Sequence, residues 1–188
     1  MTLILRLDCS PRGAESRSRR LADRLVTALQ TRHPGSRVVY RDLAANPPSL
    51  PDAQFAKAMN LSVERREAVD LAALAEAERS IAELEACDLL VLATPMHNFT
   101  VPVVLKAWID QVVLINRSFR STPTGKVGRL RDRPAYIVTV GGGRYLGAAA
   151  TQPDFLTPYL KTVFATIGLH DLRFIQRDAT IREPAFPD

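Results

Sequence analysis

Three predicted elements meet in the stretch Asp88-Leu89-Leu90-Val91-Leu92-Ala93-Thr94-Pro95-Met96-His97-Asn98-Phe99-Thr100-Val101-Pro102. The apolar run over 88–93 predicts a buried strand, the next residues an irregular loop, and residues 102–114 a helix with Pro102 in its first turn. The loop carries an amide, an imidazole, a thioether and an aromatic ring, and prolines near its ends stiffen it. In α/β proteins, ligands bind outside the carboxyl ends of strands. This mixture of groups suits one face of a large, flat ligand.

The same alternation of strand and helix continues in both directions along the chain. Strands are predicted over residues 2–8, 37–43, 88–93, 134–140 and 172–176. Helices are predicted over residues 17–32, 53–59, 62–86, 102–114 and 153–167. Residues 44–52 form a proline-rich loop, and residues 115–133 predict a small excursion or an irregular hairpin. The alternation indicates one α/β domain over residues 1–188, with a five-stranded parallel sheet and helices on both faces, for which the flavodoxin-like order 2-1-3-4-5 is expected.

The bulk composition limits the possible functions. The 188 residues are 46% hydrophobic and 24% charged, as in an ordinary globular protein. The net charge is +5, but the arginines are dispersed without a long basic run, so no nucleic-acid partner is expected. No apolar run approaches the roughly 20 residues that span a bilayer, so no membrane partner is expected either. Cys9 and Cys87 adjoin predicted strands, which predicts buried free thiols and a cytoplasmic location, and no metal site is expected.

Three loops follow the first, third and fourth predicted strands, and this strand order brings them to one edge of the sheet. The first loop ends at a helix N-terminus, which attracts anions, and Ser10, Ser16 and Ser18 add hydroxyl groups, although Ser16 alone could be a simple helix cap. The loop lacks the glycine pattern of dinucleotide sites and the Gly-Lys-Ser/Thr of nucleotidases.

The other two loops suit the ring system of a cofactor. Asn98 offers a donor and an acceptor, the complement of a pyrimidine-like edge, whereas His97, Met96 and Phe99 have ordinary loop packing as their alternative role. Residues Val140-Gly141-Gly142-Gly143 let the backbone approach a ligand closely, although three glycines alone also describe a flexible turn. A phosphate loop, an amide-bearing loop and a glycine loop together indicate a mononucleotide-like cofactor, and FMN fits this description.

At these residues the chain resembles the FMN-dependent NADH:azoreductases, also called FMN-dependent NADH:quinone oxidoreductases. The resemblance covers nearly the whole chain and rests on Ser10-Pro-Arg, Ser16-Arg17-Ser18, and Pro95-Met96-His97-Asn98-Phe99 followed by Pro102, Leu105-Lys106 and Trp108-Ile109-Asp110. It implies noncovalent FMN and a homodimer with two active sites at its interface. It also implies that Ser10, Ser16, Arg17 and Ser18 hold the phosphate, while the ring lies against Pro95, Met96, His97, Asn98, Phe99, Val140, Gly141, Gly142 and Gly143.

The resemblance further implies a two-electron cycle. NADH or NADPH gives a hydride to flavin N5 and leaves, and a quinone or an aromatic azo compound then occupies the same face, which is a ping-pong scheme. Two positions depart from the family pattern: His97 stands where tyrosine is usual, and Val140-Gly141 stands where Ser-Arg is usual. These departures affect substrate preference and nicotinamide choice more than FMN binding. His97 is expected to tune the flavin or orient the acceptor, and no obligatory catalytic acid is assigned.

Three other functions are alternatives to that of a reductase. A low-molecular-weight phosphatase needs Cys-x5-Arg, but the position required after Cys9 is Glu15, which has the wrong charge. A receiver domain needs an acidic cluster at the ends of two strands, and Asp8 finds no partner because the third strand ends in Ala93-Thr94. A noncatalytic dimer that senses flavin or quinone remains open, and turnover with NADH and a quinone separates it from an enzyme.

Overall fold

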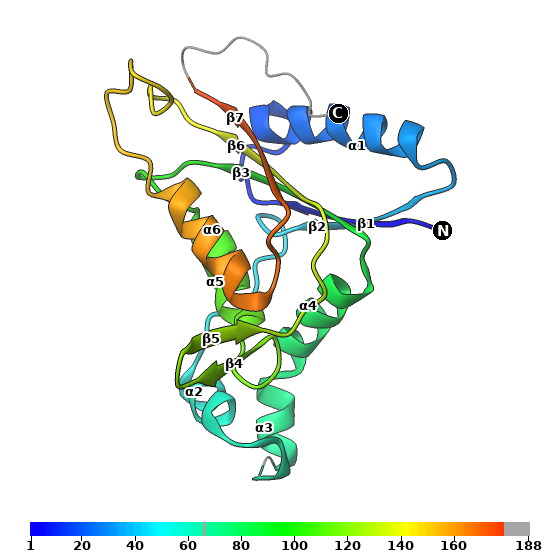
Figure 1. Cartoon of the computed structure of the whole chain (residues 1–188), viewed down its shortest axis with the longest axis vertical. Coiled ribbons are helices and arrows are strands. Elements are labelled where there is room, and N and C mark those ends of the chain that lie inside the picture. Colours follow the sequence, from blue (N-terminus) through cyan, green and yellow to red (C-terminus); the bar gives the residue numbers. More distant parts are fainter. Residues whose placement is uncertain (66, 179–188) are drawn as a thin grey trace.

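The computed structural model describes residues 1–65 and 67–178 and contains a five-stranded parallel sheet (Figure 1). Its strands are β1 (Leu3–Asp8), β2 (Arg37–Asp42), β3 (Leu89–Pro95), β6 (Ala135–Val140) and β7 (Leu172–Arg177). They lie in the order β2-β1-β3-β6-β7, and every neighbouring pair is parallel. Counted among themselves, these five strands run 2-1-3-4-5; the labels differ because two hairpin strands outside the sheet take the numbers 4 and 5.

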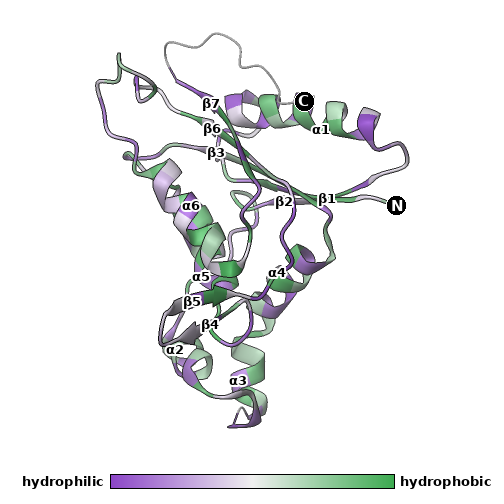
Figure 2. Ribbon diagram, in the orientation of Figure 1, coloured by the Kyte–Doolittle hydropathy of each residue, from purple (hydrophilic) through white to green (hydrophobic). Residues whose placement is uncertain are grey.

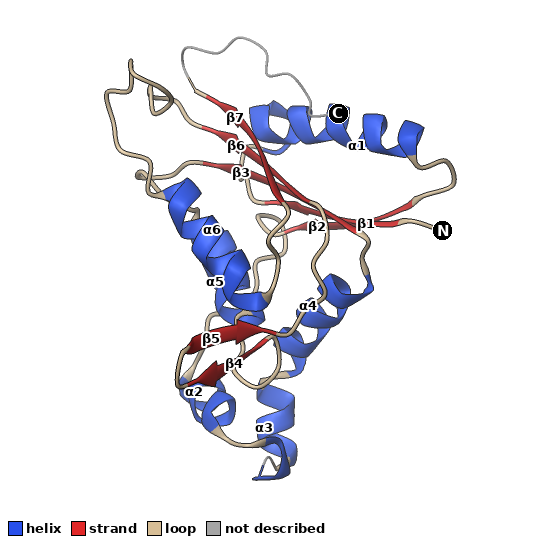
Figure 3. Ribbon diagram, viewed as in Figure 1, coloured by secondary structure: helices blue, strands red, loops and turns tan. Residues whose placement is uncertain are grey.

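The hairpin occupies the segment for which the sequence predicts an excursion. Strands β4 (Phe119–Thr122) and β5 (Gly125–Gly128) pair antiparallel and form a separate two-stranded sheet below the main one (Figures 1 and 3). Pro123 and Thr124 form the connection between them, as expected for a turn that proline can begin. The hairpin leaves the five parallel strands uninterrupted.

Helices cover both faces of the main sheet. Helix α1 (Arg17–Arg32) packs on one face, where Leu21, Leu25 and Leu29 are buried in the i, i+4 stripe that the sequence predicts. Helices α4 (Ala75–Ala86), α5 (Val103–Val112) and α6 (Leu156–Ile167) lie on the opposite side (Figure 1). The predicted α/β architecture is therefore confirmed for the described residues.

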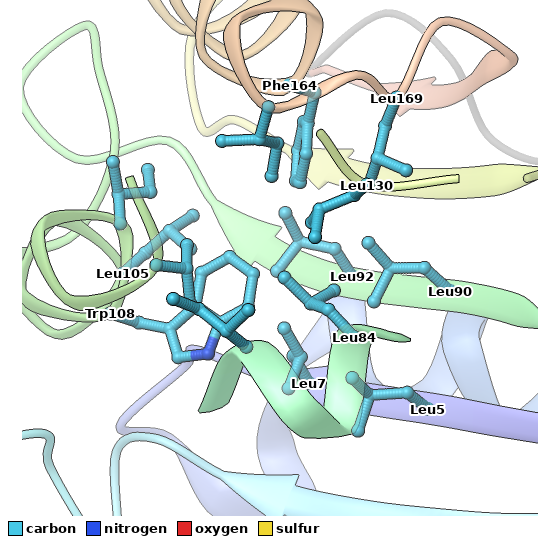
Figure 4. Close-up of a cluster of buried hydrophobic side chains, with 14 of the residues drawn as sticks. Leu5, Leu7, Leu84, Leu90, Leu92, Leu105, Trp108, Leu130, Phe164 and Leu169 are labelled. Atoms are coloured by element: carbon cyan, nitrogen blue, oxygen red, sulfur yellow. The ribbon is translucent and has the colours of Figure 1, made fainter. Parts of the chain in front are cut away.

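The larger core lies between the sheet and helices α4, α5 and α6. Leu90 and Leu92 of β3 face this core, whereas Val91 and Ala93 face helix α1, so the strand is buried on both sides. Apolar colouring is accordingly concentrated on the strands and on the inner faces of the helices (Figure 2). Figure 4 shows the side chains that meet here, which include Leu5, Leu7, Leu84, Leu90, Leu92, Leu105, Trp108, Leu130, Phe164 and Leu169.

The prediction of one continuous helix over residues 62–86 is wrong. A short 3-10 turn (Val63–Arg65), helix α3 (Ala68–Ala73) and helix α4 occupy this segment, and residue 66 lies outside the described residues, as does the end of the predicted domain, 179–188. Glu67 and Asp70 form a capping box, in which the Asp70 carboxylate accepts the Glu67 N–H at 3.0 Å. This reciprocal cap begins a new helix. Helix α2 (Ala53–Asn60) matches its predicted position.

The two cysteines are buried free thiols, as predicted. Cys9 directly follows β1, and Cys87 caps the C-terminus of α4. Among the helices of residues 1–65 and 67–178, none combines the length and the apolar character that crossing a membrane requires.

Candidate functional site at the strand ends

The three loops singled out in the sequence meet where β1, β3 and β6 end. Strand β3 lies between the other two, and main-chain bonds continue the pairing beyond the strands: Cys9 N donates to Ala93 O at 2.9 Å, and Met96 N donates to Val140 O at 2.8 Å. Strand β1 comes first in the chain, and the later strands are added on both of its sides, β2 on one side and β3, β6 and β7 on the other. The carboxyl ends of β1 and β3 therefore lie at the topological switch point of the sheet. Ligand sites of open α/β sheets form at such points.

Two adjoining cavities occupy this edge. One, of about 270 Å³, is lined by Ser10, Arg12, Ser16, Arg17, Ser18, Pro95, Met96, His97, Val140, Gly141 and Gly142. The other, of about 230 Å³, is lined by Met96, Asn98, Phe99, Gly141, Gly142, Gly143 and Gln152. They share Met96, Gly141 and Gly142, so they form the two ends of one depression. Every residue predicted for the site lines one or both of them.

The first cavity begins at the N-terminus of α1, where the chemistry favours an anion. Ser16 caps the helix by accepting the Arg19 N–H at 3.3 Å, so the simple capping role is confirmed, and Ser16 also lines the cavity. The Oγ atoms of Ser16 and Ser18 lie 3.0 Å apart, and one hydrogen between them leaves another O–H to donate. The first N–H groups of a helix have no intrahelical acceptor, and the helix dipole adds positive potential.

The loop after β3 is a tight turn with unusual backbone angles. His97 N donates to Thr100 O at 2.9 Å and Thr100 N donates to His97 O at 3.0 Å, with Asn98 and Phe99 at the two central positions. Their φ angles are +46° and +71°, as in a type I′ turn. Asparagine tolerates this region, but phenylalanine rarely adopts it, and such strain clusters at ligand sites. The turn aligns Asn98 and Phe99 along the second cavity.

The glycine loop after β6 is packed and is not a freely flexible turn. A Cβ atom on Gly141 would lie 2.7 Å from the Tyr145 ring, and one on Gly143 would overlap Oε1 of Gln152. Tyr145 is buried, which raises its pKa to about 12, and its hydroxyl lies 3.1 Å from Oγ1 of Thr139. At Gly142, in contrast, a Cβ would meet nothing within 4 Å. The loop thus closes on protein at Gly141 and Gly143 and opens to the cavity at Gly142.

Two residues of the lining were not predicted from the sequence. Arg12 belongs to the Ser10-Pro-Arg motif, and its place in the anion-attracting loop is a signal that would have identified it. Gln152 follows Gly143 by nine positions and carries no pattern of its own. It lines the cavity because Thr151 N and Gln152 N both donate to Arg144 O, which folds the loop back, and its Nε2 lies 3.3 Å from the Met96 sulfur.

The structure also argues against the function of a low-molecular-weight phosphatase. A phosphatase nucleophile needs an accessible thiolate, but Cys9 is fully buried, and burial raises the pKa of its thiol. Glu15, which stands where the phosphatase loop requires arginine, has a side chain that is 82% exposed, and it does not line the cavity. In the described part of the chain, no group of three or more His, Cys, Asp or Glu side chains could hold a metal ion.

The arrangement fits a mononucleotide. Hydroxyl groups, the Arg12 and Arg17 side chains and a helix N-terminus line one end of the depression, which suits a phosphate. An amide, a thioether, an aromatic ring and open glycine backbone line the other end, which suits a flat heterocycle. Together the cavities reach the size range of small-ligand sites, about 300–1,000 Å³.

Fold and site define a flavodoxin-like protein, and a family model described as the flavodoxin-like fold matches residues 2–186. A protein from Cupriavidus pinatubonensis named FMN-dependent NADH:quinone oxidoreductase 2 is 44% identical over 99% of this chain and 90% of its own length. A protein from Burkholderia lata named FMN-dependent NADH:quinone oxidoreductase 5 is 46% identical over 100% and 90%, respectively. The chain therefore belongs to the family of FMN-dependent NADH:quinone oxidoreductases.

Solved structures of low sequence identity share the fold. A Bacillus anthracis azoreductase superposes with a TM-score of 0.84 at 22% identity, over 95% of this chain and 87% of that one. An FMN-dependent NADH-azoreductase from the same species, solved in complex with FMN, also gives a TM-score of 0.84, at 20% identity over 96% and 88% of the two chains. Both comparisons confirm the flavodoxin-like architecture.

The glycine loop supplies a test of the site's packing. Replacement Gly141→Ala is expected to lower the free energy of unfolding by about 1–3 kcal/mol, because the added methyl group must displace the buried Tyr145 ring. Gly142→Ala is the matched control and is expected to leave the free energy of unfolding unchanged, since its methyl group enters open space. Urea unfolding of the FMN-free proteins measures both values. Equal losses in the two variants would contradict the packing described for this loop.

Proposed function

We propose that the protein is an oxidoreductase that uses noncovalent FMN to pass two electrons from NADH to quinones, and that it also cleaves aromatic azo compounds reductively. The observation that carries this proposal is the single depression at the switch point, with anion donors at one end and a ring-sized polar and apolar surface at the other. The names of the related proteins support the cofactor, the reductant and the quinone. The names of the structural neighbours supply the azo substrates.

We assign the two ends of the depression to two parts of FMN. Ser10, Ser16, Arg17 and Ser18 hold the phosphate, with Arg12 beside them. The ring system lies between the segment Pro95–Phe99 and the segment Val140–Gly143. When bound, FMN supplies the hydride chemistry, since it can take up two electrons from a nicotinamide and release them to an acceptor.

The chain itself contributes orientation and electrostatics. Gly142 N–H and Gly143 N–H have no acceptor within the part of the chain that the structure describes, so they are available to stabilise negative charge that develops on the ring. The amide of Asn98, aligned by the strained turn, reads the polar edge of the ring. Phe99 borders the same cavity and reduces the access of water to the ring.

Steady-state kinetics test the proposed cycle. With FMN added, NADH and a benzoquinone are expected to give turnover and parallel double-reciprocal lines, because both substrates use one face of the site in turn. Intersecting lines would contradict the shared face. Binding of FMN without any turnover would instead favour the noncatalytic sensing protein.

His97 is expected to influence the acceptor without acting as an obligatory acid. The atoms of His97 that shape the turn are its main-chain N and O, which any residue provides. Replacement His97→Gln should therefore lower kcat/KM for the quinone by less than about tenfold, whereas loss of an essential general acid costs about 10²–10⁴-fold. The same assay measures this value. A hundredfold loss with FMN still bound would make the imidazole a catalytic group.

We also propose a homodimer in which each active site is completed at the interface. Most of the apolar surface of α5 is buried within its own chain, so this helix by itself does not support a dimer. The support comes instead from three exposed apolar residues, Phe99 at 45%, Val103 at 71% and Phe155 at 59%, of which Phe99 lines the ring cavity. Phe155 N donates to Phe99 O at 3.1 Å, which joins two of them.

Equilibrium sedimentation tests the dimer. The wild-type protein is expected at twice the monomer mass, and Phe155→Glu should shift it toward the monomer because a charge placed in an apolar interface is costly to desolvate. The substitution Leu71→Glu, at an exposed position of α3, is the control. A wild-type protein at the monomer mass would overturn the proposal.

A further inference from the structure

Arg19 is a mostly buried arginine that touches the anion-binding loop but does not line the cavity. Its side chain is 12% exposed. Its Nη2 donates to the main-chain O of Ser10 at 2.7 Å, and its two Nη atoms donate to the Asp42 carboxylate at 2.6 and 2.8 Å. One guanidinium therefore connects the end of β2 to the start of the loop after β1.

The same residue also holds the far end of this loop. The main-chain N–H of Arg19 donates to Oγ of Ser16, the helix cap, at 3.3 Å. Ser10 and Ser16 are both buried, they flank the exposed residues 11–15 of the segment that leads into α1, and both line the first cavity. Arg19 thereby contacts both ends of this segment, Ser10 through its side chain and Ser16 through its main chain.

A wider ionic network keeps the guanidinium in place. Asp8, fully buried, accepts two hydrogen bonds from Arg6 at 3.1 and 2.9 Å and one from the Tyr40 hydroxyl at 3.0 Å. The Tyr40 hydroxyl in turn accepts from Arg19 at 2.8 Å. Asp42 also accepts the N–H groups of Ala44 and Ala45, both at 3.0 Å, so the carboxylate has a fixed orientation. Buried charges persist only where such partners hold them.

The positive charge of Arg19 is committed to protein carboxylates. Besides the two bonds to Asp42, an Nη atom lies 3.7 Å from the Asp8 carboxylate. A charge neutralised in this way contributes little attraction to an external anion, so the effect of Arg19 on the cavity comes from geometry.

We propose that Arg19 is a positioning residue that makes this site prefer a phosphorylated flavin over an unphosphorylated one. The inference rests on the proposed FMN function and extends it to a residue outside the cavity. With Ser10 and Ser16 held at fixed spacing, the hydroxyl groups and the helix N-terminus match a phosphate. Without the Arg19 contacts, the loop loses the arrangement that matches a phosphate. The ring end of the depression, built from the loops after β3 and β6, stays as it is.

Binding of two flavins tests the proposal. Dissociation constants of FMN and riboflavin are measured for the FMN-free full chain by quenching of flavin fluorescence. Arg19→Gln should raise the constant for FMN by about tenfold, the effect of losing a charge-assisted hydrogen bond, and leave that for riboflavin unchanged. Arg19→Lys should behave like Arg19→Gln, because an ammonium group cannot bridge Ser10 and Asp42 as the planar fork does. Asp42→Asn, which keeps the arginine, should give a smaller loss in the same direction.

Arg32→Gln is the matched control, because it removes the same charge from the last turn of the same helix. It should change neither constant. Equal losses for FMN and riboflavin in the Arg19 variants would show a merely structural role and overturn the proposal. A wild-type affinity in Arg19→Lys would show that charge, and not geometry, matters, which also overturns it. If Arg19→Gln fails to fold, Arg19→Lys and Asp42→Asn carry the same comparison. A wild-type protein that binds neither flavin would instead refute the proposed function itself.

Discussion

Parallel pairing of β1, β3 and β6 is the constraint on which the rest of the structure depends. Parallel strands present their carboxyl ends at one edge, and β3 lies between its two partners, so the loops that follow all three strands must meet. This pairing requires burial on both faces, which α1 provides on one side and α4, α5 and α6 provide on the other. The apolar residues of β3 therefore do more than fill a core, because they determine that the three loops form one site.

The loops at that edge are specialised by local backbone chemistry. Ser16 caps α1 and at the same time borders the first cavity, so one residue belongs to both the helix cap and the cavity wall. Phe99 accepts a backbone conformation that costs energy, and Gly141 and Gly143 leave room that side chains of Tyr145 and Gln152 fill. Behind the first loop, an ionic network centred on Asp8 and Asp42 replaces the apolar packing found elsewhere. Each loop thus has its own support from the protein before any ligand arrives.

Much of this was predictable from the sequence, and the exceptions have physical reasons. Strands such as Leu89–Pro95 are buried, continuous and bounded by turn residues, so their type followed from the apolar pattern, whereas their order was inferred from the frequency of the fold and the chemistry of the loops. The break before α3 was missed because the residues around Glu67 and Asp70 have high helix propensity, which predicts a continuous helix. The capping interaction between Glu67 and Asp70 depends on side-chain geometry, which the sequence pattern does not show. Gln152 and Arg19 were missed because their roles depend on contacts with residues distant in sequence, Met96 for the first and Ser10 and Asp42 for the second.

The absorption spectrum of the purified protein, with identification of the flavin that it releases on denaturation, tests the central claim most directly. We expect a yellow protein, or a colourless one that becomes yellow on addition of FMN, and release of FMN rather than FAD, because we propose that the first cavity holds a single phosphate at the N-terminus of α1. A protein that remains colourless and takes up no added FMN would contradict the claim that the edge formed by β1, β3 and β6 is a flavin site.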